Sequence, residues 1–125
     1  MSDGEISDDE ITPEELNALL EEGEDVRIVD IRSAGEFDRG SIPGSENVPF
    51  QTLPREVEEL AGEERVVTVC PKGQASLQAM RIIESYEGTD GEVRSLAGGL
   101  DAWSRDYELE KSEESETGAD ADAPF

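Results

Sequence analysis

The sequence has no histidine and a single cysteine, Cys70, among its 125 residues. One cysteine excludes an intrachain disulfide, and with no histidine a zinc site is not expected. We predict no metal and no cofactor. Basic residues are also few: 10 Lys and Arg stand against 33 Asp and Glu, so the formal net charge is −23. Because such a chain repels phosphates, we expect neither nucleic acid nor a membrane surface as a partner.

Long hydrophobic segments are missing as well. The longest apolar strand candidate is residues 66–70, far short of the roughly 18 apolar residues that a membrane span requires. Residues 1–5 have neither the basic start nor the apolar run of a secretory signal peptide. These absences favour a cytoplasmic protein.

The acidic residues are most one-sided at the two ends. Residues 1–10 hold five acids and no base, and residues 112–125 hold another five with no base. Both ends lack the hydrophobic residues that offset the entropy of ordering, so we predict disordered tails at 1–10 and 110–125 around one domain at 11–109. The domain is itself acidic, and eight of the ten bases of the chain are arginines. This composition is typical of halophilic proteins, in which salt screens the self-repulsion; an acidic mesophilic protein with charged tails is the alternative.

Strands and helices alternate along the domain. A capping box formed by Thr12 and Glu15 predicts the start of the first helix, and Ser33 with Glu36 predicts the start of a short second one. The expected strands are 26–31, 47–50, 66–69 and 92–96, and the expected helices are 12–23, a turn from 33, 54–62, a longer one from 76, and 100–103. This alternation predicts a three-layer α/β domain, in which helices cover both faces of a parallel sheet.

The residues that carry chemistry follow the strand at 66–69. Cys70 ends this strand, at the edge where open α/β sheets bind ligands. The loop 70–76 then enters a helix, whose first N–H groups and positive dipole end stabilise a thiolate and a bound anion. Lys72 adds a positive charge, and Gly73 allows a backbone conformation that a side chain would hinder. We predict a reactive thiol; a buried, inert cysteine is the alternative.

Four blocks of sequence occur in a distinctive order around this cysteine. They are Ile11-Thr12-Pro13-Glu14-Glu15-Leu16; Val29-Asp30-Ile31-Arg32-Ser33-Ala34-Gly35-Glu36-Phe37 with Gly40, Ile42, Pro43, Gly44 and Asn47-Val48-Pro49; Val69-Cys70 through Ser76; and Leu96-Ala97-Gly98-Gly99-Leu100-Asp101-Ala102-Trp103. In this order and spacing the blocks resemble the rhodanese-like family over most of residues 11–107, although each block alone is a weak signal. The resemblance implies a three-layer rhodanese-like α/β domain with a parallel sheet of about five strands and helices on both faces.

The same resemblance implies a sulfurtransferase. In that family the loop cysteine takes a sulfane sulfur from a donor such as thiosulfate, becomes a persulfide and passes the sulfur to cyanide or a protein thiol; a sulfur-relay protein is a further candidate partner. Asp30 and Arg32 match the family's Asp-x-Arg motif, which helps shape the pocket; a structural ion pair is the alternative for them. Carried over by position, Cys70 is the nucleophile and the substrate-binding loop is Pro71, Lys72, Gly73, Gln74, Ala75 and Ser76.

One loop position departs from the family pattern, and two other functions compete. An arginine commonly precedes the last serine or threonine of the loop, where this chain has Ala75, so Lys72 is the only full charge of the loop. A cysteine phosphatase or arsenate reductase needs an arginine six positions after the cysteine to clamp the phosphoryl oxygens, and Ser76 stands there. A non-catalytic rhodanese-like binding module often loses the cysteine that this chain keeps. The sulfurtransferase is therefore favoured.

Overall fold

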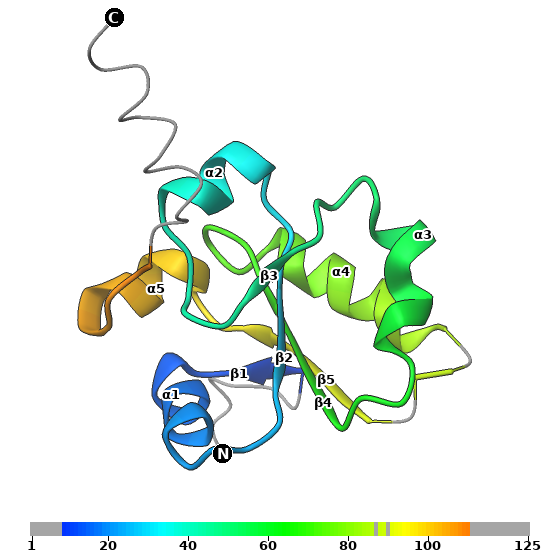
Figure 1. The fold of residues 1–125 in the computed structure, drawn as a ribbon, viewed down its shortest axis with the longest axis horizontal. Helices are drawn as coiled ribbons and strands as arrows, with labels where there is room; N and C mark the ends of the chain where they lie inside the picture. The colour runs from blue at the N-terminus through cyan, green and yellow to red at the C-terminus, as the bar shows by residue number, and fades with distance from the viewer. Residues whose placement is uncertain (1–8, 87, 90, 111–125) are drawn as a thin grey trace, which may run out of the picture.

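A computed structural model describes residues 9–86, 88–89 and 91–110 and shows a parallel sheet whose strands alternate with helices (Figure 1). The strand order is β1-β5-β4-β2-β3, which places β4 at the centre of the sheet. This architecture confirms the predicted three-layer α/β fold. The strands are β1 (Glu10–Ile11), β2 (Arg27–Asp30), β3 (Glu46–Asn47), β4 (Arg65–Val69) and β5 (Glu92–Leu96); the helices are α1 (Pro13–Glu21), α2 (Ala34–Arg39), α3 (Leu53–Glu56), the 3-10 helix η1 (Val57–Leu60), α4 (Ala75–Glu84) and α5 (Gly99–Asp106).

Capping boxes begin the first two helices at the predicted residues. The Thr12 hydroxyl accepts a hydrogen bond from Glu15 N at 3.1 Å, and Glu15 Oε1 accepts one from Thr12 N at 3.0 Å. Ser33 and Glu36 form the same reciprocal pair at α2. Each box satisfies N–H groups that the first helical turn leaves without a partner. Both predictions are confirmed.

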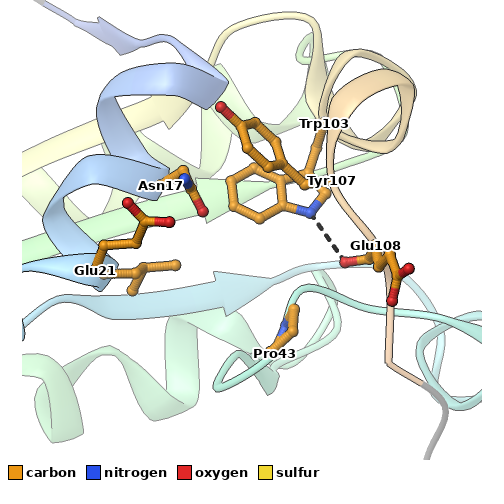
Figure 2. Close-up of a pocket in the computed structure, with 7 residues that line it drawn as sticks. Asn17, Glu21, Pro43, Trp103, Tyr107 and Glu108 are labelled. Carbon is orange, nitrogen blue, oxygen red and sulfur yellow. Dashed lines mark hydrogen bonds between the residues drawn. The ribbon is translucent and has the colours of Figure 1, made fainter.

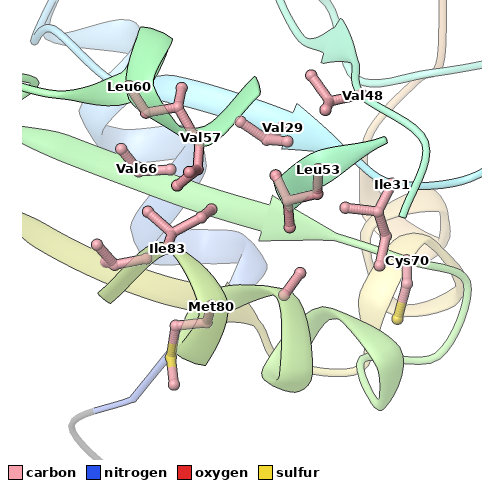
Figure 3. Packing of buried hydrophobic residues seen from close by; sticks show 12 residues of the cluster. Val29, Ile31, Val48, Leu53, Val57, Leu60, Val66, Cys70, Met80 and Ile83 are labelled. Carbon is pink, nitrogen blue, oxygen red and sulfur yellow. The ribbon is translucent and has the colours of Figure 1, made fainter. Parts of the chain in front are cut away.

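The sheet carries a different core on each face, because successive side chains of a strand point to opposite faces. Val66 packs with residues of α3, η1 and α4, whereas Val67 packs with residues of α1 and α5. Figure 3 shows the first of these cores, which extends to Cys70 just beyond the end of β4. Helices α4 and α5 thus cover opposite faces, and both begin at the edge of the sheet where β4 and β5 end (Figure 1).

The structure corrects the expected boundaries of both tails. Glu10, predicted to lie in the N-terminal tail, begins β1, which pairs with β5. Glu110, predicted to lie in the C-terminal tail, forms an antiparallel bridge with Ser41 through hydrogen bonds of 2.7 and 3.0 Å. A two-residue strand is too short to show a hydrophobic pattern, and the bridge is formed by main-chain atoms, which leave no signal in the sequence. Asp9, also in the predicted N-terminal tail, accepts a hydrogen bond from Ser95 N at 2.8 Å. Residues 1–8 and 111–125 lie outside the described residues.

Two further findings concern the helices. The helix expected over 54–62 is a short α-helix, α3, that continues as the 3-10 helix η1, and α5 extends beyond the expected 100–103. Within the described ranges no helix has both the length and the apolar character needed to cross a membrane. The cytoplasmic location stays a prediction.

Candidate active site

The loop after β4 directs its N–H groups toward the sulfur of Cys70. Gly73 N donates to Cys70 Sγ at 3.0 Å and Ser76 N donates at 3.3 Å. Sγ is also 3.3 Å from Ser76 Oγ: a thiol donates to this hydroxyl, and a thiolate accepts from it. Because α4 has no side-chain N-cap, the sulfur takes the place of a cap for the N–H of Ser76. The main chain therefore supplies hydrogen bonds that suit a sulfur anion.

Two opposing influences act on the pKa of Cys70. Burial raises this pKa, because the residue is 2% exposed and the charged form loses its hydration. Hydrogen bonds from the Ser76 hydroxyl and from the N–H groups of Ser76, Lys72 and Gly73 favour the thiolate, and together they hold the pKa of Cys70 below its usual value. Since the thiolate is the nucleophilic form, this site suits a reactive thiol better than an inert cysteine.

A glycine turn between β5 and α5 supports the loop from behind. The N–H groups of Leu100 and Asp101 donate to the carbonyls of Cys70 and Pro71 at 2.9 and 3.0 Å. Gly99 has a φ of +62°, and a Cβ at this position would overlap the Cys70 carbonyl and lie 2.6 Å from the carbonyl carbon of Pro71. Only glycine allows the two backbones to approach so closely. With these carbonyls held by α5, the following N–H groups are free to bind the sulfur.

A cavity of about 240 Å³ opens above this loop. Lys72 is exposed beside it, and Ala75 leaves its position at the start of α4 without a charge. Gly73 and Ser76, the two loop residues that do not line the cavity, are buried, and their N–H groups donate to the sulfur. Five residues of the predicted loop thus line one cavity, and the remaining two bind the sulfur from within. The lining residues are Cys70, Pro71, Lys72, Gln74 and Ala75.

Asp30 and Arg32, predicted to support the pocket, form an ion pair at the end of β2. Arg32 Nη2 lies 2.8 Å from Asp30 Oδ2 and donates to the Gly40 carbonyl at 2.6 Å. Asp30 is fully buried, and its strand is the neighbour of β4. Among the described residues, the hydrogen bonds of these two side chains run to each other, to the N–H of Arg32 and to Gly40. The pair thus ties β2 to the end of α2, and a role in supporting the pocket stays a prediction.

Two hydroxyls beneath the loop were not predicted from the sequence. Thr68 of β4 and Ser95 of β5 are both 0% exposed and are paired in register. Thr68 Oγ1 donates to the Ser76 carbonyl at 2.7 Å, and Ser95 Oγ lies 2.6 Å from Ser76 Oγ. A signal was present: Ser95 follows Val93 by two residues and so shares its buried face, where a polar residue needs a hydrogen-bond partner.

A larger cavity of about 370 Å³ lies between α1 and α5, and no residue of the loop 70–76 lines it (Figure 2). Trp103 and Tyr107 line one side, with ring centroids 4.7 Å apart, and Pro43 lines another. The indole N–H of Trp103 donates to the Glu108 carbonyl at 3.4 Å, and Trp103 is 2% exposed. This tryptophan therefore packs α5 against the core.

A thiol held by main-chain N–H groups at the carboxyl edge of a parallel sheet defines a class of α/β domains with a cysteine nucleophile beside an anion-binding loop. Comparison with known families makes the assignment specific. Residues 12–106 match the rhodanese-like domain family, and the chain belongs to that family.

Several relatives of this chain are sulfurtransferases by name. The chain is 36% identical over 98 residues to a sulfurtransferase of Allochromatium vinosum, and the match covers 77% of this chain and 88% of the relative. It is 33% identical over 90 residues to the thiosulfate sulfurtransferase GlpE of Shewanella oneidensis, with coverage of 70% and 87%. It is also 31% identical to an adenylyltransferase and sulfurtransferase of Zea mays, of which it spans only 22%. These names support a transferase role.

A solved structure from the same family has the same fold. The crystal structure of a rhodanese-like domain protein from Staphylococcus aureus matches with a TM-score of 0.72 at 31% sequence identity. The match covers 83% of this chain and 98% of that one. Almost the whole of that rhodanese-like domain protein therefore has a counterpart in this chain.

Proposed function

We propose that this protein is a thiosulfate sulfurtransferase-like enzyme that carries a sulfane sulfur as a persulfide on Cys70. The proposal depends on one observation: Cys70 lines a cavity of about 240 Å³, and its Sγ is hydrogen-bonded to the N–H groups of Gly73 and Ser76 and to the Ser76 hydroxyl. A thiolate held in this way is a nucleophile, and the adjacent loop N–H groups favour negative charge on a second sulfur bound to it.

The proposed reaction has two steps. In the first, the Cys70 thiolate attacks the outer sulfur of thiosulfate; a new S–S bond forms, the S–S bond of thiosulfate breaks, and its electron pair leaves with sulfite. In the second, cyanide or a thiolate attacks the outer sulfur of the persulfide, and Cys70 leaves as a thiolate with thiocyanate or a new persulfide as product. Both steps balance without an outside electron or proton. The exposed Lys72 supports the binding of an anionic donor.

A protein thiol of a sulfur-relay partner is our proposal for the acceptor within the cell. The longer relative from Zea mays supports this idea, because its name combines a sulfurtransferase with an adenylyltransferase. In that relative the matching segment is part of a larger protein. Cyanide then serves as the acceptor of the laboratory assay.

The mass of the purified protein after exposure to thiosulfate tests the proposed function. We expect a gain of one sulfur atom on Cys70, the only thiol of the chain, and its loss on addition of cyanide. A gain from a neutral persulfide donor but not from thiosulfate would contradict thiosulfate as the donor and keep the sulfurtransferase. No gain from either donor would favour a non-catalytic rhodanese-like module and overturn the proposal.

We further propose that the acidic composition adapts the enzyme to high salt. At an ionic strength of about 0.01 M the screening length is about 30 Å, so carboxylates across the whole domain oppose an anionic donor and the Cys70 thiolate. At 1 M or more the screening length falls to about 3 Å. The N–H groups of the loop and Lys72 then determine the electrostatic potential at the sulfur, because the distant carboxylates are screened. With a net charge of −23, we expect turnover with thiosulfate to rise as potassium chloride increases.

A titration in potassium chloride from about 0.1 to 3 M measures this effect, with a neutral persulfide donor as the control. We expect turnover with the neutral donor to rise less, because salt then changes only the stability of the Cys70 thiolate and not the repulsion of the donor. Rates are compared only where circular dichroism shows a folded protein, since salt also stabilises an acidic fold. A monotonic fall in turnover with thiosulfate while the fold persists would contradict the high-salt proposal.

A further inference from the structure

The hydroxyl of Ser95 has one partner for its proton. Ser95 is 0% exposed on β5, and its Oγ lies 2.6 Å from Ser76 Oγ. In the part of the chain that the structure describes, Ser76 Oγ is the only hydrogen-bond partner of this hydroxyl. A serine hydroxyl carries one proton to donate, and a buried donor without an acceptor is destabilising. The proton of Ser95 is therefore directed to Ser76 Oγ.

This direction decides where the proton of Ser76 points. Ser76 Oγ has two partners, Ser95 Oγ at 2.6 Å and Cys70 Sγ at 3.3 Å. When it accepts from Ser95, its own proton is free to be donated to the sulfur, which suits a thiolate. In the reverse direction Cys70 donates to Ser76, Ser76 donates to Ser95, and the proton of Ser95 has no acceptor. The arrangement in which every hydroxyl is satisfied thus favours negative charge on Cys70.

A second hydroxyl keeps Ser76 in place. Thr68 is the neighbour of Ser95 across β4 and β5, and its Oγ1 donates to the Ser76 carbonyl at 2.7 Å. Two adjacent central strands thus hold the main chain and the side chain of Ser76 separately. All three residues are 0% exposed, so water does not compete for these hydrogen bonds.

We propose that Ser95 is a positioning residue for Cys70: by donating to Ser76 Oγ, it directs the Ser76 proton to the sulfur and stabilises the thiolate. The inference rests on the proposed function of Cys70 and adds to it a residue from another strand. The charged groups at this edge of the sheet are Lys72 of the loop, Asp101 in the first turn of α5, and the ion pair of Asp30, the last residue of β2, with Arg32. The neighbouring elements also carry Arg65 on β4, Glu92 and Arg94 on β5, Arg81 and Glu84 on α4, and Arg105 and Asp106 on α5. A substitution of Ser95 leaves all of these in place.

The test is the titration of Cys70 in four forms of the full chain: unchanged, Ser95→Ala, Ser76→Ala and the double variant. The thiolate is followed by its ultraviolet absorbance and by the rate of alkylation with iodoacetamide as pH is varied. We expect Ser95→Ala to raise the pKa of Cys70 and to slow alkylation below that pKa by about two- to tenfold, the factor that one hydrogen bond supplies. We expect no further effect of Ser95→Ala in a chain that already carries Ser76→Ala.

The matched control is Ser41→Ala, which removes another buried hydroxyl, 6% exposed, whose hydrogen bond runs to Glu110. We expect it to leave the titration of Cys70 unchanged. An unchanged titration in Ser95→Ala, or an equal shift with and without Ser76→Ala, would overturn the proposal. If the alanine variant does not fold, Ser95→Val, which also lacks the hydroxyl and suits a strand, provides the same comparison. Because these measurements need no sulfur donor, their failure leaves the proposed function standing, and failure to form a persulfide leaves this result standing.

Discussion

Replacing Cys70 by serine is expected to abolish sulfur transfer from every donor while the fold stays intact. Cys70 is the only thiol of the chain, and a serine oxygen cannot form the persulfide. The serine hydroxyl can still accept hydrogen bonds from Gly73 N and Ser76 N, which hold the sulfur at 3.0 and 3.3 Å. The loop therefore keeps its partners. Thiocyanate formation from thiosulfate and from a neutral persulfide donor measures the loss, and thermal unfolding checks the fold.

Cys70→Ala provides the comparison, because it removes the acceptor as well as the thiol. The N–H groups of Gly73 and Ser76 then lose their partner in a buried place, so we expect a lower thermal midpoint than for Cys70→Ser. Both variants should be inactive to the same degree. Measurable transfer by either one would contradict the covalent role of Cys70, since the chain has no second thiol to replace it.

The sequence was sufficient to predict the central strands of the sheet and the loop after β4, because both have local signals. The capping pairs of Thr12 and Ser33 mark helix starts that the structure shows at α1 and α2. The apolar run of β4 ends directly at Cys70, so the position of the thiol at the edge of the sheet follows from a single strand and the helix after it. Where neighbours in sequence form the feature, pattern and propensity are enough.

Features built from distant segments could not be predicted in the same way. Strand β1 is two residues long and exists through its pairing with β5. The contact of Ser95 with Ser76 joins residues 19 positions apart, and it depends on the register of β4 and β5. Gly99 belongs to a sequence motif, but the physical reason for a glycine there, the Cys70 carbonyl at the place that a Cβ would occupy, appears only in three dimensions. That reason also predicts what a side chain there does.

Gly99→Ala is expected to lower sulfur transfer by about a hundredfold or more, because it displaces the loop that holds Cys70. The new Cβ would overlap the Cys70 carbonyl and lie 2.6 Å from Gly73 N, and both are backbone atoms that cannot rotate away as a side chain can. The N–H groups that follow Gly99 also bind the Cys70 and Pro71 carbonyls, so any shift of the turn moves the loop. Turnover of thiosulfate and the alkylation rate of Cys70 measure the effect.

Variants of two other glycines serve as controls, because they introduce backbone strain without displacing the loop. Gly23 has a φ of +77° and no atom within 4 Å of the point that a Cβ would occupy, so Gly23→Ala carries the left-handed penalty, about 1–2 kcal/mol, without a clash. Gly62 has a φ of +84° and is open in the same way, with no atom within 4 Å of the point that a Cβ would occupy. We expect both variants to lose thermal stability and to keep normal alkylation of Cys70. Gly99→Ala is compared with these two variants at equal thermal stability. If its turnover and its rate of Cys70 alkylation equal theirs, close packing of the turn does not hold the loop around the sulfur.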